Sequence, residues 1–193
     1  PVLHRVRAQV HRPADAVLLR QHGEGYVSDR NLRASDFDSN LGEANNPEWK
    51  TIVFDRKSGR FIAPNGTIGF RWGEEGKWNL LEQAGEAQAE TEAELTCIDS
   101  RDEVVSVGFP HFVPGEKALL YRNVPVRRLK LASGEEVFVT SVFDMQIAQY
   151  GIDRGLGGGN VAKSYDDASV AYTPAWAAKQ TGVKAAELER TGR

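Results

Sequence analysis

The chain has 193 residues, of which 40% are hydrophobic and 26% are charged, and its formal net charge is -3. These values fit one globular domain or a part of a larger one. The near balance of charge gives no reason to expect nucleic acid or an anionic membrane as a partner, and no apolar run is long enough to cross a bilayer.

The first 22 residues differ in character from the rest. The basic side chains in this stretch are His4, Arg5, Arg7, His11, Arg12, Arg20 and His22. Because no continuous apolar run accompanies them, we expect no signal peptide. We interpret residues 1–22 as an atypical N-terminal stretch, with a non-native origin as one explanation, and residues 23–193 as the domain segment.

Short strands and turns are predicted after residue 50. Residues 51–54 form a β-branched and aromatic run, Ser58 and Gly59 follow as a turn, and residues 60–63 predict a second strand. Residues 64–66, Pro-Asn-Gly, predict a further turn because Asn and Gly tolerate positive φ. Residues 67–72 then predict another strand.

The next stretch has a different composition. Residues 84–93 are rich in Ala, Glu and Gln without an apolar face, which predicts an exposed loop tip or a frayed helix. Cys97 is the single cysteine of the chain. One thiol cannot form an internal disulfide or supply the usual Cys set of an iron–sulfur cluster or a structural zinc site. We interpret Cys97 as a small buried hydrophobe rather than a reactive thiol.

The C-terminal half predicts a hairpin and then helices. Residues 126–142 alternate like two strands around a turn at Ser133 and Gly134. Residues 145–154 have helical spacing. The residues expected to pack inward from that helix are Ile147, Tyr150 and Ile152.

Residues 155–160 break that helix. Thr173 and Pro174 predict the start of another helix, with Thr as N-cap and Pro in the first helical position. Gly182 is expected to end it, and a further helix follows from Val183 onward.

Several sequence blocks carry a family resemblance when they are taken together. They are residues 45–51 (NNPEWKT), 63–83 (APNGTIGFRWGEEGKWNLLEQ), 107–110 (VGFP), 164–167 (SYDD) and 171–177 (AYTPAWA). In residues, order and spacing they resemble the catalytic (alpha) subunit of membrane-bound respiratory nitrate reductases. These enzymes belong to the molybdopterin oxidoreductase (DMSO reductase) family. The last block is shared more widely across molybdopterin oxidoreductases.

The resemblance implies an α/β fold, as a fragment of a large molybdopterin oxidoreductase domain with a β-rich insertion at about residues 51–143. It also implies that the parent enzyme reduces nitrate to nitrite at a molybdenum bis-molybdopterin guanine dinucleotide, with a 4Fe-4S centre. The implied partners are an iron–sulfur electron-transfer subunit and a membrane subunit that oxidises quinol in anaerobic respiration. These partners would hold the enzyme at the cytoplasmic face of the cell membrane.

The resemblance also has a limit. The family's catalytic subunit is longer, and its Cys/His cluster and its molybdenum-ligating Asp lie in segments that this sequence does not match. We therefore interpret the chain as an internal fragment that supplies no metal ligand, scaffolds the cofactor domain and is inactive alone. The alternatives are a non-catalytic scaffold or binding module, or a fragment of another molybdopterin oxidoreductase.

One group of candidate residues could line a route for a small anion. These substrate-route candidates are Arg71, Trp72, Lys77 and Trp78. Arginine donates paired hydrogen bonds to planar oxyanions such as nitrate, and an aromatic wall would confine one. The simpler interpretation places the tryptophans in the core and pairs Arg71 with Glu74 or Glu75.

A second group lies in the glycine-rich segment 155–160. The candidates for cofactor contacts are Gly157, Gly158 and Asn160, since bare amides can line an anion. The segment lacks the Lys-Ser/Thr ending of a P-loop, so a flexible connector between helices is the simpler interpretation.

Acidic residues and histidines give little sign of a metal site. Asp166 and Asp167, with Asp144 and Asp153 upstream, could gather around a divalent cation, but helix capping or solvent exposure is the simpler interpretation. His111 lacks a second His at helical spacing, so a zinc hydrolase has no support.

Overall fold

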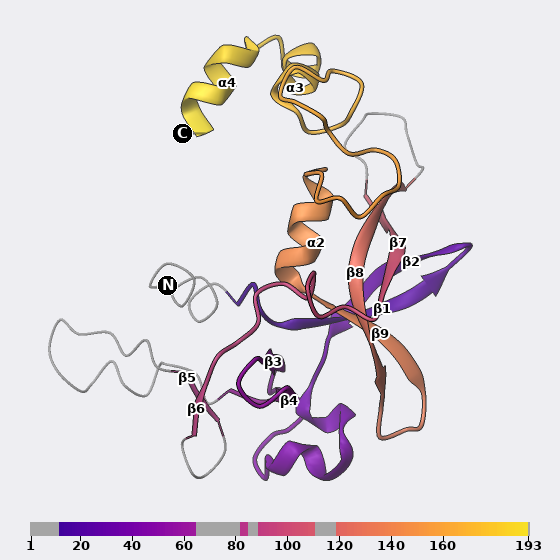
Figure 1. Cartoon of the computed structure of the whole chain (residues 1–193), viewed down its shortest axis with the longest axis vertical. Coiled ribbons are helices and arrows are strands. Elements are labelled where there is room, and N and C mark those ends of the chain that lie inside the picture. The colour runs from indigo at the N-terminus through magenta and orange to yellow at the C-terminus, as the bar shows by residue number, and fades with distance from the viewer. Residues whose placement is uncertain (1–11, 65–81, 85–88, 111–118, 193) are drawn as a thin grey trace, which may run out of the picture.

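The computed structural model describes residues 12–64, 82–84, 89–110 and 119–192. A closed barrel lies at the centre of this part of the chain (Figure 1). In the order of their hydrogen bonding its strands are β1 (Ala16–His22), β2 (Gly25–Asn31), β7 (Glu103–Phe109), β8 (Leu120–Lys130) and β9 (Glu136–Ser141). Neighbours are antiparallel except β2 and β7, which run parallel and meet at Tyr26 and Val107.

Strand β1 shows how alternation of side chains builds the core. Successive residues of a strand point to opposite faces, and both faces of β1 are buried over its first four residues. Ala16 and Leu18 join one buried cluster, whereas Leu19 joins another. The first cluster also holds Leu32, Ala34, Ile52, Ala63 and Val139, and the second holds Val105, Val107, Phe109, Val124, Val126 and Ala148.

Smaller elements lie outside the barrel, and the β5–β6 pair lies farthest from it (Figure 1). They are the 3-10 helices η1 (Ala34–Asp36) and η2 (Asp38–Gly42), the pair β3 (Val53–Asp55) and β4 (Arg60–Ile62), and the pair β5 (Glu82–Ala84) and β6 (Ala89–Thr91). Asp55 joins the two pairs, because its carboxylate accepts hydrogen bonds from the Glu92 amide at 2.7 Å and the Ser58 hydroxyl at 2.6 Å. Burial raises the pKa of Asp55, but these hydrogen bonds outweigh burial and leave the pKa below its ordinary value.

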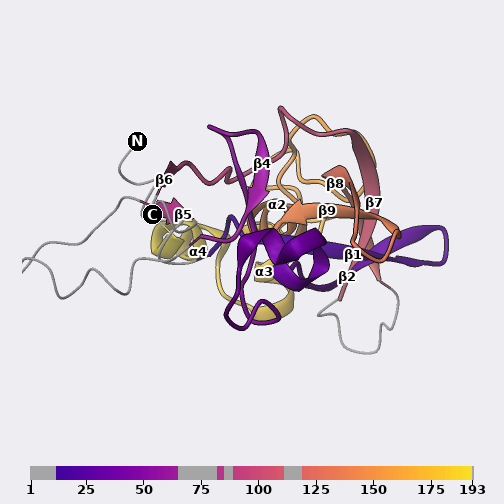
Figure 2. The ribbon, with the colours of Figure 1, turned by 90° about the horizontal axis from the view of Figure 1, so that it is seen from below.

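Three helices follow the barrel strands. Helix α2 (Val142–Gln149) begins directly after β9, where the Ser141 hydroxyl accepts a hydrogen bond from the Asp144 amide. Helices α3 (Pro174–Thr181) and α4 (Ala185–Gly192) pack against each other at the end of the molecule opposite η1 and η2 (Figure 1). Seen from below, α3 lies behind the 3-10 helices (Figure 2).

Many local predictions are confirmed. The two strands expected at 51–63 are β3 and β4, joined by a turn in which Gly59 has φ of 66°. The hairpin expected at 126–142 is the β8–β9 hairpin. Thr173 caps α3 by accepting a hydrogen bond from the Trp176 amide, and Gly182 ends the helix at φ of 76°.

For residues 84–93 the frayed-helix alternative is wrong in the described part, whereas the loop-tip alternative falls largely on residues 85–88, outside the described residues. The ends of this segment belong to β5 and β6, which pair antiparallel from Glu82 opposite Thr91 to Ala84 opposite Ala89. Ala93 is buried in a small cluster with Ala14 and Val53. Composition gave no strand signal, because residues 84–93 are poor in the β-branched and aromatic residues typical of strands. The burial of Ala93 comes from Ala14 and Val53, which are distant in sequence.

The predicted helix at 145–154 has the wrong limits. Helix α2 starts earlier, at its Ser141 cap, and stops at Gln149, before Gly151 adopts φ of 71°. Tyr150 and Ile152 therefore do not pack inward and remain exposed. The inward face of α2 is instead formed by Asp144 and Ala148.

The described chain mixes helix and strand around a β-rich core. The β-rich part is not confined to about 51–143, because β1 and β2 belong to the same barrel as β7–β9. The predicted boundary after residue 22 falls between the paired strands β1 and β2, and the interpretation of residues 1–22 as an atypical stretch stays a prediction. No described helix combines the length and the apolar character needed to span a membrane.

Candidate functional site

Arg122 is the most deeply buried charged residue on the described barrel strands. All the acceptors of its hydrogen bonds are neutral backbone carbonyls. Arg122 lies on β8 and is 1% exposed. Its Nε donates to the carbonyl oxygen of Asn160 at 2.6 Å, and one terminal nitrogen donates to that of Ala171 at 3.2 Å. The other donates to the carbonyl oxygens of Ala148 at 3.2 Å and Gln149 at 2.5 Å. One side chain thus joins the end of α2 to two later segments.

Burying the Arg122 cation is unfavourable in itself, and the carbonyls at the end of α2 offset part of that cost. Burial lowers the pKa of Arg122, because taking the cation out of water disfavours the charged form. The carbonyls at the C-terminal end of α2 carry partial negative charge, which favours a cation there. The guanidinium passes so close to Gly151 that a Cβ at this position would lie 2.7 Å from its terminal nitrogen. Only glycine fits.

The glycine-rich segment is bound to the same strand. It contains the three predicted cofactor candidates Gly157, Gly158 and Asn160. The Asn123 amide donates to the carbonyl oxygen of Leu156 at 3.0 Å, and a Cβ at Gly158 would lie 2.8 Å from that amide nitrogen. The Asn160 amide donates to the carbonyl oxygen of Tyr121 at 3.2 Å. These contacts fit the connector interpretation, while cofactor binding by this segment stays a prediction.

A second buried network surrounds Asp144, in the first turn of α2. Its carboxylate is completely buried and accepts hydrogen bonds from the Thr96 hydroxyl at 2.5 Å and the Cys97 amide at 2.9 Å. It also accepts from the Ser141 hydroxyl at 2.9 Å and forms an ion pair with Arg154 at 2.7 Å. The network holds the 94–100 loop and the segment after α2 against the barrel.

Cys97 is buried, as predicted. Burial and the negative charge of Asp144 raise the pKa of the Cys97 thiol to about 12. The thiol donates to the carbonyl oxygen of Pro125 at 3.1 Å and lies 3.2 Å from the Asp144 carboxylate. A thiol in this environment stays protonated at neutral pH, so it is a poor nucleophile and a poor metal ligand.

The acidic candidates are not brought together in the described part of the chain. Asp144 pairs with Arg154, whereas the exposed Asp153 accepts a hydrogen bond from the Gly155 amide. Asp167 accepts a hydrogen bond from the Ser169 hydroxyl. Thr173, rather than Asp166 or Asp167, caps α3. Within the ranges that the structure describes, no group of three or more His, Cys, Asp or Glu residues could hold a metal ion.

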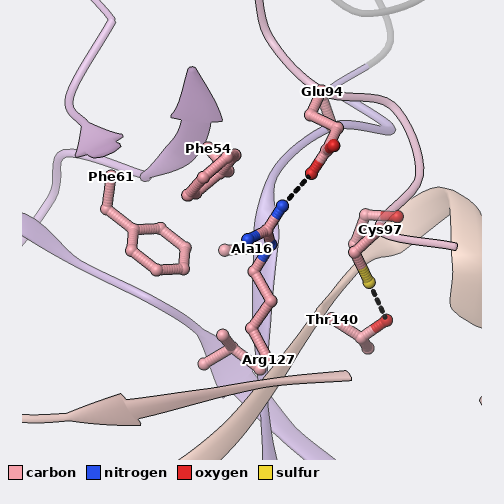
Figure 3. A pocket seen from close by; sticks show the side chains of 10 residues that line it. Ala16, Phe54, Phe61, Glu94, Cys97, Arg127 and Thr140 are labelled. Atoms are coloured by element: carbon pink, nitrogen blue, oxygen red, sulfur yellow. Dashed lines mark hydrogen bonds and ion pairs between the residues drawn. The ribbon is translucent and has the colours of Figure 1, made fainter. Parts of the chain in front are cut away.

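A small pocket lies between the barrel and the β3–β4 pair (Figure 3). Arg127 crosses it, stacked 3.6 Å from the centre of the Phe54 ring and paired with Glu94 at 2.7 Å. The other lining residues include Phe61, Cys97 and Thr140. The pocket encloses about 20 Å³, which is room for about one water molecule. It is too small for a polyatomic substrate or a cofactor.

The substrate-route candidates Arg71, Trp72, Lys77 and Trp78 lie outside the described residues, so they stay predictions. The same holds for His4, His11 and His111. The turn predicted at 64–66 and the strand predicted at 67–72 also lie largely or wholly outside the described residues. The sequence analysis did not predict the buried cation of Arg122 or the partly buried cations of Arg127 and Arg154. A signal existed for Arg122, since it shares its strand phase with the buried Val124 and Val126.

Comparison with known proteins gives relatives of one kind. No protein-family model matches the chain. The respiratory nitrate reductase 1 alpha chain of Escherichia coli (strain K12) is 46% identical over 187 residues, covering 92% of this chain and 15% of that protein. The respiratory nitrate reductase 2 alpha chain of the same strain is 43% identical, with the same coverage. The nitrate reductase alpha chain of Bacillus subtilis (strain 168) is 34% identical, covering 92% of this chain and 14% of that protein. The chain thus spans a small part of the curated relatives it matches.

Proposed function

This chain is homologous along most of its length to the alpha chains of nitrate reductases, and we propose that it is a segment of the catalytic subunit of a respiratory nitrate reductase. The observation that supports this proposal is the extent of the match. The similarity covers 92% of the chain, so it is not confined to a motif that unrelated enzymes share.

The proposal extends to the parent enzyme. The parent enzyme reduces nitrate to nitrite, and a molybdenum bis-molybdopterin guanine dinucleotide supplies the oxygen-atom transfer when bound. Electrons reach it from quinol through iron–sulfur centres, an electron-transfer subunit and a membrane subunit. These partners place the enzyme at the cytoplasmic face of the membrane.

The described residues do not fit as ligands for these cofactors. The buried carboxylate of Asp144 is occupied by Arg154 and three other residues. The Cys97 thiol, with its pKa raised to about 12, is a poor source of the thiolate that a cluster requires. We therefore assign no step of the reaction to these residues.

The role that we propose for the segment is that of a scaffold. Arg122, Asp144 and Arg127 each join pieces of chain that are far apart in sequence, and each is buried or nearly so. Buried polar groups that are satisfied internally fix one arrangement of the segments they connect. Such a unit can hold neighbouring cofactor-binding segments in place without touching the substrate.

The test compares the 193-residue chain with the complete alpha chain assembled with its partner subunits. Molybdenum and iron content and nitrate reduction by reduced viologen are measured for both. We expect metal and activity in the complete assembly and neither in the 193-residue chain. Stoichiometric molybdenum with activity in the 193-residue chain contradicts the scaffold role. Reduction of a different oxyanion, without nitrate reduction, by the complete assembly would favour another molybdopterin oxidoreductase.

A further inference from the structure

An apolar groove lies at the α3–α4 end of the molecule. Its walls come from the turn after α2, from residues 162–165, from residues 172–174 and from α4, and it encloses about 580 Å³. Tyr150, Ile152, Tyr165, Pro174 and Leu188 supply much of its lining, and we refer to it as the C-terminal groove. The space is large enough for several side chains of another segment.

The groove gathers large apolar side chains that face solvent. Tyr150 and Tyr165 are each 64% exposed, and Ile152 is 50% exposed. Exposed apolar residues scattered singly are ordinary on protein surfaces, but a contiguous group around a concave site marks an interaction surface. The turn that presents Tyr150 and Ile152 is fixed by Arg122, which bonds to the last turn of α2.

The helices beside the groove also lack a core of their own. Neither α3 nor α4 contains a buried residue, although they pack against each other. Each has eight residues, and isolated helices of this length are unstable in water. Further packing on this side would stabilise both helices.

We propose that the C-terminal groove is the docking surface for an apolar segment of the same alpha chain, outside the 193 residues described in the sequence. This inference rests on the proposed function. The chain spans 15% of the respiratory nitrate reductase 1 alpha chain, so most of such a polypeptide lies outside these residues and could supply the docking segment. A covalently linked segment also has a higher effective concentration than a second copy or another subunit. The charged residues of the lining, Asp153, Lys163 and Glu189, are of mixed sign, which suits an apolar rather than a strongly charged occupant.

The first experiment is photo-crosslinking in the complete alpha chain, assembled with its partners. Benzoylphenylalanine is incorporated in place of Tyr165 and, as a control, in place of the exposed Lys130 on the β8–β9 hairpin. We expect Tyr165 to yield crosslinks to alpha-chain peptides outside residues 1–193 and Lys130 not to yield the same peptides. Crosslinks only to a second copy, crosslinks only to another subunit, or an absence of crosslinks at Tyr165 would each overturn the proposal.

A second experiment uses hydrogen exchange in the same assembly. Ile152→Asp places a charge in the groove, whereas Val183→Asp places one on the exposed α3–α4 turn, outside the groove lining. We expect Ile152→Asp to speed exchange of the α4 amides by about tenfold or more, and Val183→Asp to have a much smaller effect. Equal effects would overturn the proposal. Nitrate reduction by the unsubstituted assembly tests the proposed function separately: retained activity with failed docking refutes only the docking surface.

Discussion

Replacing Arg122 with methionine tests whether one buried cation holds the C-terminal segments against the barrel. Methionine keeps much of the side-chain length but removes all of the hydrogen bonds. The carbonyls of Gln149, Asn160 and Ala171 lose this donor, whereas that of Ala148 keeps the Gly151 amide at 2.9 Å. A buried acceptor left unsatisfied, such as that of Ala171, costs about 1–3 kcal/mol, the more accessible carbonyls of Gln149 and Asn160 cost less because water can reach them, and relief from burying the cation offsets part of the total. We expect Arg122→Met to destabilise the attachment by about 2–4 kcal/mol.

The assay is amide hydrogen exchange in the 193-residue chain. A loss of about 2–4 kcal/mol corresponds to an increase of about 30- to 1,000-fold in opening. The reporter is the Ala162 amide, which donates to the Gly151 carbonyl at 2.8 Å. The matched control is Arg128→Met on the same strand, because Arg128 is exposed and its ion pair with Glu103 contributes about 1 kcal/mol at most. Equal exchange at Ala162 in the two variants would refute the reasoning.

Three further predictions concern buried acids and the thiol. Asp144→Asn leaves the Arg154 cation unpaired and should lower the free energy of unfolding in urea by about 3–5 kcal/mol, whereas the exposed Asp153→Asn should change it by about 0.5 kcal/mol or less; similar losses would argue against the network. Because the pKa of Cys97 is raised to about 12, maleimide labelling at about pH 8 should be more than about a hundredfold slower in the folded than in the urea-unfolded chain, and equal rates would contradict this. The pKa of Asp55 is lowered in the folded chain, so its contribution to stability is present above the unfolded-state pKa of about 3.9 and lost as the pH falls through the folded pKa. Asp55→Asn should therefore flatten the acid side of the stability profile measured by urea unfolding, and an unchanged slope would contradict the assignment.

The sequence predicted those features that local chemistry decides. Thr173 and Pro174 start α3 because a hydroxyl acceptor and a fixed φ satisfy the first turn of a helix wherever it occurs. Gly59 and Gly182 mark turns and ends because each adopts a positive φ that other residues resist. The short strands β3 and β4 followed from the β-branched and aromatic run at residues 51–54, before such a turn, and from residues 60–63 after it.

Features that depend on distant contacts were not predictable in the same way. Ala93 lies in a segment without a strand or helix pattern, yet it is buried in a cluster with Ala14 and Val53, which are distant in sequence. Tyr150 and Ile152 have helical spacing with Ile147, but α2 stops before them because Gly151 makes room for Arg122, which is distant in sequence. The family resemblance could be inferred only from several unusual sequence blocks that occur in the same order as in the family. Composition and periodicity indicate a fold class and not a reaction.

The distribution of buried polar groups bears on the choice between a catalytic and a scaffolding role. A catalytic site keeps preorganised donors or acceptors aimed at a cavity where the substrate develops charge. In the described part of this chain, Arg122 is directed at four backbone carbonyls and Asp144 is surrounded by donors from its own chain. Arg127 does border a pocket, but its ion pair with Glu94 and a volume of about 20 Å³ leave space for little more than a water molecule. The hydrogen bonds of these groups connect segments of the fold. This arrangement fits the proposed scaffold role, whereas a substrate site needs donors or acceptors that are free to bind the substrate.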